Sequence, residues 1–283
     1  MFLEEHCSFA LYGSKMEITK LLGYVLAVVV GISLGLVGSG GSILTVPILV
    51  YVMRVQPVLA TAYSLFVVGM TSLVGGIQSA QQKKVDFKTV LIFGIPSIVS
   101  VYLTRAYLLP LVPDTIFSIA DFEVTKPMAL MVLFALVMVF ASVSMIRPCI
   151  DCQKDETNPI KYHYPLIWIE GLLVGVLTGF VGAGGGFLII PALVLLTKMP
   201  MRLAVGTSLF IIAAKSLLGF IGDVQGEQQM DWAMLSTFTG LSIIGIFIGI
   251  FLSRKIDNDK LKTVFGWFVL LMGIYILIKE IWA

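Results

Sequence analysis

Charged residues are scarce in this 283-residue chain. Asp, Glu, Lys and Arg together make up 13% of it, about half of the roughly 25% that is usual in soluble domains. Hydrophobic residues make up 58%, and this combination excludes a water-soluble globular protein. The formal net charge is only +2, so the composition gives no sign of a nucleic-acid partner.

Histidine and cysteine are also scarce, and their positions argue against an intramembrane enzyme. The histidines, His6 and His163, lie outside the apolar segments, so a buried Ser–His protease or a His-rich metal site has no base or ligand. Cys149 and Cys152 form a C-x-x-C pair, which we interpret as reduced, solvent-facing thiols. No Gly-x-x-x-x-Gly-Lys-Ser/Thr loop is present for a nucleotide. We therefore expect no enzymatic activity, no metal and no cofactor.

Long apolar runs are abundant. A membrane-spanning helix needs about 20 mostly apolar residues, whereas an outer-membrane barrel would alternate apolar and polar residues. We therefore predict an all-α polytopic membrane protein of the cell membrane, without a cleaved signal peptide. The segments long enough to span are 58–81, 89–109, 127–146, 202–222, 232–253 and 261–279.

Two further apolar regions, 18–53 and 165–197, are each interrupted by glycines. Their second arms, 43–53 and 187–197, would rise only about 16 Å as helix, half of a hydrocarbon core about 30 Å thick. We therefore expect two glycine-broken hairpins. The clusters read Gly38-Ser39-Gly40-Gly41-Ser42 and Gly182-Ala183-Gly184-Gly185-Gly186.

The two clusters belong to an internal repeat. A shift of 144 residues superimposes the glycines, Pro47 on Pro191, and Ser64-Leu-Phe on Ser208-Leu-Phe. The chain therefore divides into a first transmembrane repeat (1–146), a central polar loop (147–164) and a second transmembrane repeat (165–283). Each repeat contains a broken hairpin and three spanning helices.

Charged loops indicate how the repeats are oriented, because basic residues collect on the cytoplasmic side. The loop around 83–88 is rich in lysine, whereas its equivalent contains Asp223, Glu227 and Asp231. The following loops show the reverse, with acidic residues at 114–123 and basic residues at 254–262. This favours inverted copies with both termini outside. The alternative, parallel halves of four spans each, would place the basic loop 254–262 outside.

Backbone that leaves helical geometry in a membrane must be buried in protein or line a watery cavity. Paired breaks of this kind are typical of transporter sites. A helix that restarts after a break presents free N–H groups and a positive dipole end, which favours an anion. We expect Gly-x-x-x-Gly spacing at 31 and 35, and at 175 and 179, to serve helix packing instead. The substrate-binding candidates in the breaks are Gly38, Ser39, Gly40, Gly41, Ser42, Gly182, Gly184, Gly185 and Gly186.

Polar residues in the following apolar segments complete the predicted site. Lys215 is the strongest candidate, because an ionisable group near the middle of a membrane-spanning segment has a high free-energy cost. It could bind the anion or couple a proton, or form a structural pair with Asp223 or Glu170. Asp223 lies about 12 Å away along a helix, which disfavours that pair. We expect Arg105 to extend to the membrane interface, and Glu170 to be a helix-start charge or a proton site. The further substrate-binding candidates are Ser64, Thr71, Thr207 and Ser208.

The doubled motif resembles the TauE/SafE sulfite exporter family. It reads GSGGSILTVP from Gly38 and GAGGGFLIIP from Gly182, each followed by a segment containing ATAYS or AVGTS. The resemblance implies a bacterial or archaeal inner-membrane carrier of sulfite, thiosulfate, sulfoacetate or other organosulfonates. We therefore expect a secondary transporter working by alternating access. Its partners would be a small anion, the lipid bilayer and a coupling ion, proton or sodium. The alternative is an anion-selective channel or a permease for a carboxylate or another oxyanion.

Overall fold

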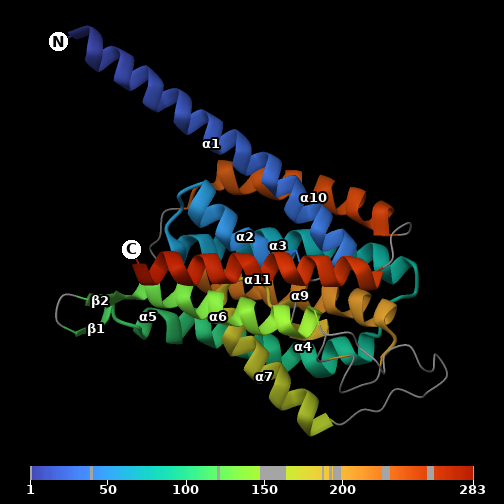
Figure 1. The fold of residues 1–283 in the computed structure, drawn as a ribbon. Coiled ribbons are helices and arrows are strands. Elements are labelled where there is room, and N and C mark those ends of the chain that lie inside the picture. Colours follow the sequence, from blue (N-terminus) through green and yellow to red (C-terminus); the bar gives the residue numbers. More distant parts are fainter. Residues whose placement is uncertain are drawn as a thin grey trace.

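The computed structural model describes residues 2–38, 41–119, 122–146, 164–186, 188–190, 193, 199–224, 230–253 and 258–282. Figure 1 shows a bundle of long helices, from which the N-terminal end of the first helix projects. The first half contains α1 (Phe2–Val37), α2 (Ser42–Pro47), the π-helix η1 (Ile48–Val52), α3 (Pro57–Gln81), α4 (Phe87–Leu103), the π-helix η2 (Thr104–Leu108) and α5 (Leu109–Leu111). The first half ends with α6 (Lys126–Ile146), and the second half contains α7 (Tyr164–Val181), α9 (Met201–Val224), α10 (Trp232–Ser253) and α11 (Asn258–Trp282).

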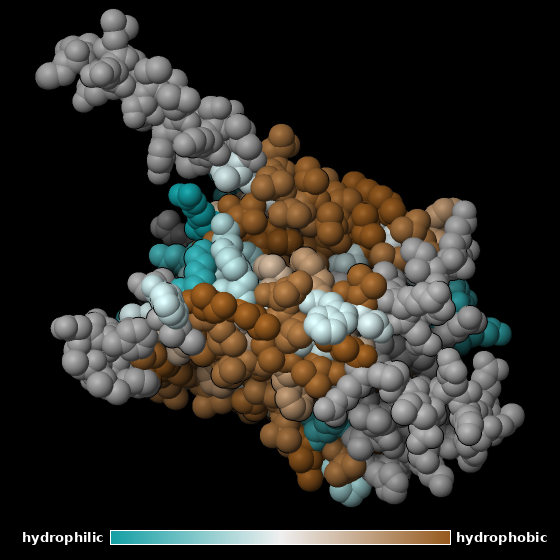
Figure 2. All heavy atoms as spheres, in the orientation of Figure 1, coloured by the Kyte–Doolittle hydropathy of each residue, from teal (hydrophilic) through white to brown (hydrophobic). Residues whose placement is uncertain are grey.

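Six helical segments of the described chain are long and apolar enough to cross a membrane. Figure 2 shows apolar surface over the middle of the molecule and hydrophilic residues mainly toward its two ends. The chain is therefore a multi-pass membrane protein, as predicted. Five of these segments match predicted spans, and the sixth is the helical arm before the first glycine cluster. The remaining predicted span, 261–279, lies within helix α11, which is not among the six. The six are Thr19–Leu36, Pro57–Gln81, Phe87–Leu111, Lys126–Val143, Leu203–Val224 and Trp232–Ser253.

One element differs from the predicted all-α fold. Strands β1 (Thr115–Ile119) and β2 (Phe122–Thr125) form an antiparallel hairpin between α5 and α6. Pro113 follows the end of α5, and the hairpin is rich in β-branched and aromatic residues, which favour strands. Apolar runs alone predicted only a loop here, because the strands are short and lie between two spanning segments.

Glycine seams hold two pairs of helices together. A Cβ on Gly31 would overlap the carbonyl oxygen of Ser242 in α10, and one on Gly35 would lie 2.5 Å from that of Ile246. In the second half, a Cβ on Gly175 would lie 2.7 Å from the carbonyl oxygen of Ser97 in α4. Such close approach requires glycine, so the predicted packing role of the Gly-x-x-x-Gly pairs is confirmed.

The helices that match under the repeat pack on each other in opposite directions. Gly69 of α3 faces Leu217 of α9, while Gly76, farther along α3, faces the earlier residue Phe210. Helices α6 and α11 are likewise antiparallel, because Gly266 faces Ile146 and the later Gly273 faces residues 135–139. Pairs α1–α10 and α4–α7 are parallel, since the seam residues ascend together along both helices.

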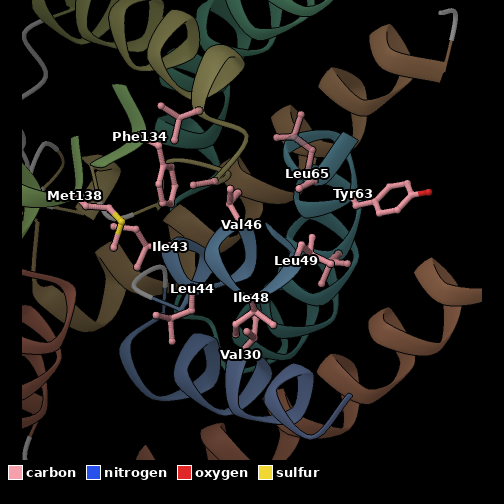
Figure 3. Close-up of a cluster of buried hydrophobic side chains, with 14 of the residues drawn as sticks. Val30, Ile43, Leu44, Val46, Ile48, Leu49, Tyr63, Leu65, Phe134 and Met138 are labelled. Carbon is pink, nitrogen blue, oxygen red and sulfur yellow. The ribbon is translucent and has the colours of Figure 1, made fainter. Parts of the chain in front are cut away.

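The arm after the first glycine cluster is enclosed by protein. Side chains of Ile43, Val46 and Leu49 are fully buried, and Figure 3 shows them among residues of α1, α3 and α6. At its far end, the Tyr51 hydroxyl donates a 2.8 Å hydrogen bond to Glu280 in α11. An arm too short to span is thereby sheltered from lipid, as its free backbone groups require.

Candidate functional site

The second glycine cluster breaks the helix as predicted, and so does the described part of the first. Helix α1 ends at Val37 and α7 at Val181, and helical structure resumes at Ser42 and at Gly186. The backbone φ angle is positive in both breaks, between +60° and +80°, a region that favours glycine. It is found at Gly38, Gly182, Gly184 and Gly185. Ser39 and Gly40 lie outside the described residues.

Each break begins against a helix of the opposite half. A Cβ on Gly38 would lie 2.5 Å from Cγ1 of Val205 in α9. A Cβ on Gly182 would lie 2.6 Å from Cα of Thr61 in α3. Val205 and Thr61 are equivalent under the 144-residue shift. The antiparallel pair α3–α9 therefore lies between the two breaks and contacts both.

Lys215 reaches from α9 to the second break. Its side chain is fully buried, and its Nζ donates a 3.3 Å hydrogen bond to Oγ1 of Thr178 in α7. A Cβ on Gly185 would lie 2.9 Å from this Nζ. Within the described ranges, no carboxylate lies within 4 Å of the Lys215 ammonium. The structural pairs with Asp223 or Glu170 that we considered do not form.

Small and apolar groups lie beside Gly184, the preceding glycine of the break. A Cβ on Gly184 would lie 2.7 Å from Cγ1 of Val68 and 3.2 Å from Oγ of Ser216. The Ser216 hydroxyl is buried and has no hydrogen-bond partner in the part of the chain that the structure describes. The second break therefore brings together a buried cation, two hydroxyls and backbone without side chains.

Thr207 lies away from this group. Its Oγ1 accepts a 2.9 Å hydrogen bond from the backbone N–H of Asp86. The equivalent residue of the first half, Tyr63, accepts a 2.6 Å hydrogen bond from the backbone N–H of Asp231. Thr207 precedes Lys215 by two helical turns, about 12 Å. The structure therefore places Thr207 against the turn between α3 and α4 of the first half, not beside the predicted cation.

The remaining hydroxyl candidates differ in how they are used. Thr71 donates 2.6 Å to the carbonyl of Val67, and Ser208 donates 2.8 Å to that of Val205. The Ser64 hydroxyl is buried without a partner among the described residues. All three lie within the helical bundle, on α3 and α9. Thr71 and Ser208 donate to backbone carbonyls of their own helices, whereas Ser64 has no such partner among the described residues.

The first break has a different character. Gly41 packs against Ser33 and Leu34 of α1, and Ser42 is fully buried. The position equivalent to Lys215 is Thr71, so this side lacks the corresponding cation. The two breaks both begin with a glycine of positive φ, Gly38 and Gly182, but Gly41 is helical with a φ of −63° where its equivalent Gly185 has +60°, and they differ in charge.

Arg105 corrects the expectation of an interfacial side chain. It is 1% exposed, and its Nη1 donates to Oγ1 of Thr61 at 3.0 Å and to Oδ1 of Asp223 at 3.3 Å. It lies in the π-helix η2, and a π-turn changes which residues of a helix face inward. Asp223, which we assigned to a loop, lies in the last turn of α9. Sequence spacing could not reveal this pair because 118 positions separate its members.

The remaining ionisable candidates are Glu170 and the residues of the central loop. Among the described residues, no three His, Cys, Asp or Glu side chains lie close enough to hold a metal ion. Glu170 on α7 is half-buried, and its Oε2 has no partner in the described ranges. Cys149, Cys152 and His163 lie outside those ranges.

Comparison with known proteins gives consistent matches over most of the chain. Residues 24–276 match the family described as "Sulfite exporter TauE/SafE". A "Probable membrane transporter protein" of Xylella fastidiosa is 29% identical, over 90% of this chain and 93% of its own. The "Probable membrane transporter protein YunE" of Bacillus subtilis is 27% identical, over 93% of this chain and all of its own. No solved structure matches significantly. The chain belongs to the TauE/SafE sulfite exporter family of membrane transporters.

Proposed function

We propose that this protein is a secondary transporter of a small sulfur-containing anion such as sulfite, thiosulfate or sulfoacetate. The observation that carries the proposal is Lys215, which is fully buried against the second glycine break. No acidic partner lies within 4 Å of it in the described part of the chain. An ammonium buried without a counterion is costly, and a bound anion would supply the missing charge.

The second break suits an anion in further ways. Gly184 and Gly185 present backbone without side chains, so a ligand could approach closely. Ser216 and Thr178 place hydroxyls beside the same glycines. The helical segment that resumes at Gly186 would direct its N-terminal N–H groups and positive dipole end toward this region. We assign the anion to the second break and expect the first to contribute less, since it has Thr71 in place of the lysine.

Alternating access would follow from two inverted repeats, residues 1–146 and 165–283, that rock against each other. The antiparallel packing of the equivalent helices α3 and α9 supports this arrangement. So do the matched hydrogen bonds by which Thr207 and Tyr63 each hold the turn of the other half. Parallel repeats would instead place equivalent helices in the same direction.

Counterflow in proteoliposomes tests this function. Vesicles loaded with unlabelled sulfite or thiosulfate should accumulate the labelled anion transiently, because a carrier exchanges substrate across the bilayer. A steady single-channel current without counterflow would indicate an anion channel instead. Parallel assays with sulfate, sulfoacetate and simple carboxylates identify the substrate, and preference for a carboxylate would contradict the sulfur-anion proposal.

A further inference from the structure

We propose that Arg105 forms a second oxyanion-binding point beside the same break, one that requires a ligand with two oxygens side by side. The inference rests on the proposed anion transport and deepens it. Arg105 is 1% exposed, and only one of its three nitrogens has a partner among the described residues.

The unused part of the guanidinium is one continuous edge. Nη1 donates to Thr61 and to Asp223, whereas Nε and Nη2 are buried and unpartnered within the described ranges. The N–H groups of Nε and Nη2 lie in one plane and point in parallel, which is the geometry that binds two oxygens of a carboxylate or sulfur oxyanion. Thr61 and Asp223 hold the opposite end of the group, so this edge is fixed in direction.

The ion pair is incomplete as a structural feature. Asp223 contacts Arg105 through Oδ1 only, at 3.3 Å, and its Oδ2 is buried without a partner in the described part of the chain. A buried ion pair is favourable only when its remaining donors and acceptors are satisfied. Two nitrogens of the arginine and one oxygen of the aspartate are not satisfied among the described residues, so the pair has capacity for another ligand.

The position of the pair links it to the proposed site. Thr61, which Arg105 contacts, packs against Gly182, and Gly185 of the same break packs against the Lys215 ammonium. Asp223 follows Lys215 by two turns of α9, about 12 Å. Lys215 therefore contacts the break directly and Arg105 is linked to it through Thr61; in the proposal Lys215 acts as a point charge and Arg105 as a bidentate fork.

Anion binding to the purified full-length protein distinguishes the two cations. Methanesulfonate can bridge two parallel donors, whereas bromide cannot, so calorimetric titration with each anion reports the fork separately from the charge. Arg105→Lys keeps the charge and removes the fork, and should weaken methanesulfonate binding about tenfold while changing bromide binding little. Equal methanesulfonate affinity in the wild type and Arg105→Lys would overturn the proposal.

Asp223→Asn provides an independent test if Arg105→Lys fails to fold. Removing the carboxylate charge leaves the guanidinium less neutralised, so methanesulfonate should bind several-fold more tightly; unchanged or weaker binding would overturn the inference. Binding that Lys215→Met abolishes and Arg105→Lys spares would contradict only this inference. Absence of anion binding by the wild type would contradict both it and the proposed function.

Discussion

At the scale of single residues, the charge on Lys215 is the main unusual feature of the bundle. It is fully buried, its Nζ has a hydroxyl partner in Thr178, and no described carboxylate lies within 4 Å of it. A lysine that served stability would be expected to have an acidic neighbour, because an uncompensated buried charge is destabilising. We therefore expect Lys215 to serve ligand binding at the expense of stability.

Lys215→Met should raise the melting temperature of the ligand-free protein and abolish stabilisation by sulfite. Methionine has a similar length and fills the same apolar space without a charge. Thermal unfolding of the purified variant, with and without sulfite, measures both effects. Lys84→Met is the matched control, because Lys84 is exposed and its Nζ donates a hydrogen bond to Oε1 of the nearby Gln82. A marked loss of stability in Lys215→Met would indicate a structural role.

Gly185→Ala should weaken sulfite binding by disturbing the lysine. The added Cβ would overlap Cγ2 of Thr178 and lie 2.9 Å from the Nζ of Lys215, at a residue whose φ is +60°. A side chain in this backbone region costs about 1–3 kcal/mol. Gly94→Ala is the control, because a Cβ there would meet nothing within 4 Å. Sulfite-dependent thermal shifts compare the two, and equal shifts would remove Gly185 from the site.

At the scale of elements, close glycine seams fix how α1 packs on α10. Gly35→Val should strongly reduce the yield of folded protein, because its Cβ would lie 2.5 Å from the Ile246 carbonyl oxygen and 2.7 Å from the Ile250 nitrogen. The helices would have to separate along the whole seam. Gly240→Val on α10 introduces the same side chain into open space and should fold normally. Size-exclusion profiles give the comparison, and similar profiles would show that the seam tolerates separation.

Elements with local signals could be predicted from the sequence. Both glycine breaks, the packing glycines and five of the spanning helices follow from apolar run length and from the conformational freedom of glycine. The β-hairpin could not be predicted, because its strands are short and lie between two spanning segments. The Arg105–Asp223 pair depends on the packing of η2 against α9, and no spacing within one segment encodes such a contact.

The candidate site was predictable only in part for the same reason. Lys215 and Gly185 could be selected individually, since each violates a local rule of helical membrane segments. A Cβ on Gly185 would lie 2.9 Å from the Nζ of Lys215. This proximity depends on how α9 packs against the break after α7. Thr207 was selected by its register in the repeat, but tertiary packing directs its hydroxyl to Asp86 instead.

At the scale of the whole molecule, inverted repeats require that equivalent loops face opposite sides of the membrane. Lys84 lies in the turn after α3, near Gly206, whereas Asp231 lies near Tyr63 at the other end of the α3–α9 pair. In a background with Cys7, Cys149 and Cys152 replaced by serine, cysteine at 84 should be labelled from the cytoplasm and cysteine at 231 from outside. Labelling of both from one side would contradict the inversion.

The measurement closest to the central claim is sulfite counterflow by the wild type and Lys215→Met, reconstituted at equal density beside Lys84→Met. We expect saturable counterflow in the wild type and in Lys84→Met. In Lys215→Met we expect it to be abolished, although the protein remains folded and inserted. Normal counterflow by Lys215→Met would contradict the assignment of the anion to the second glycine break.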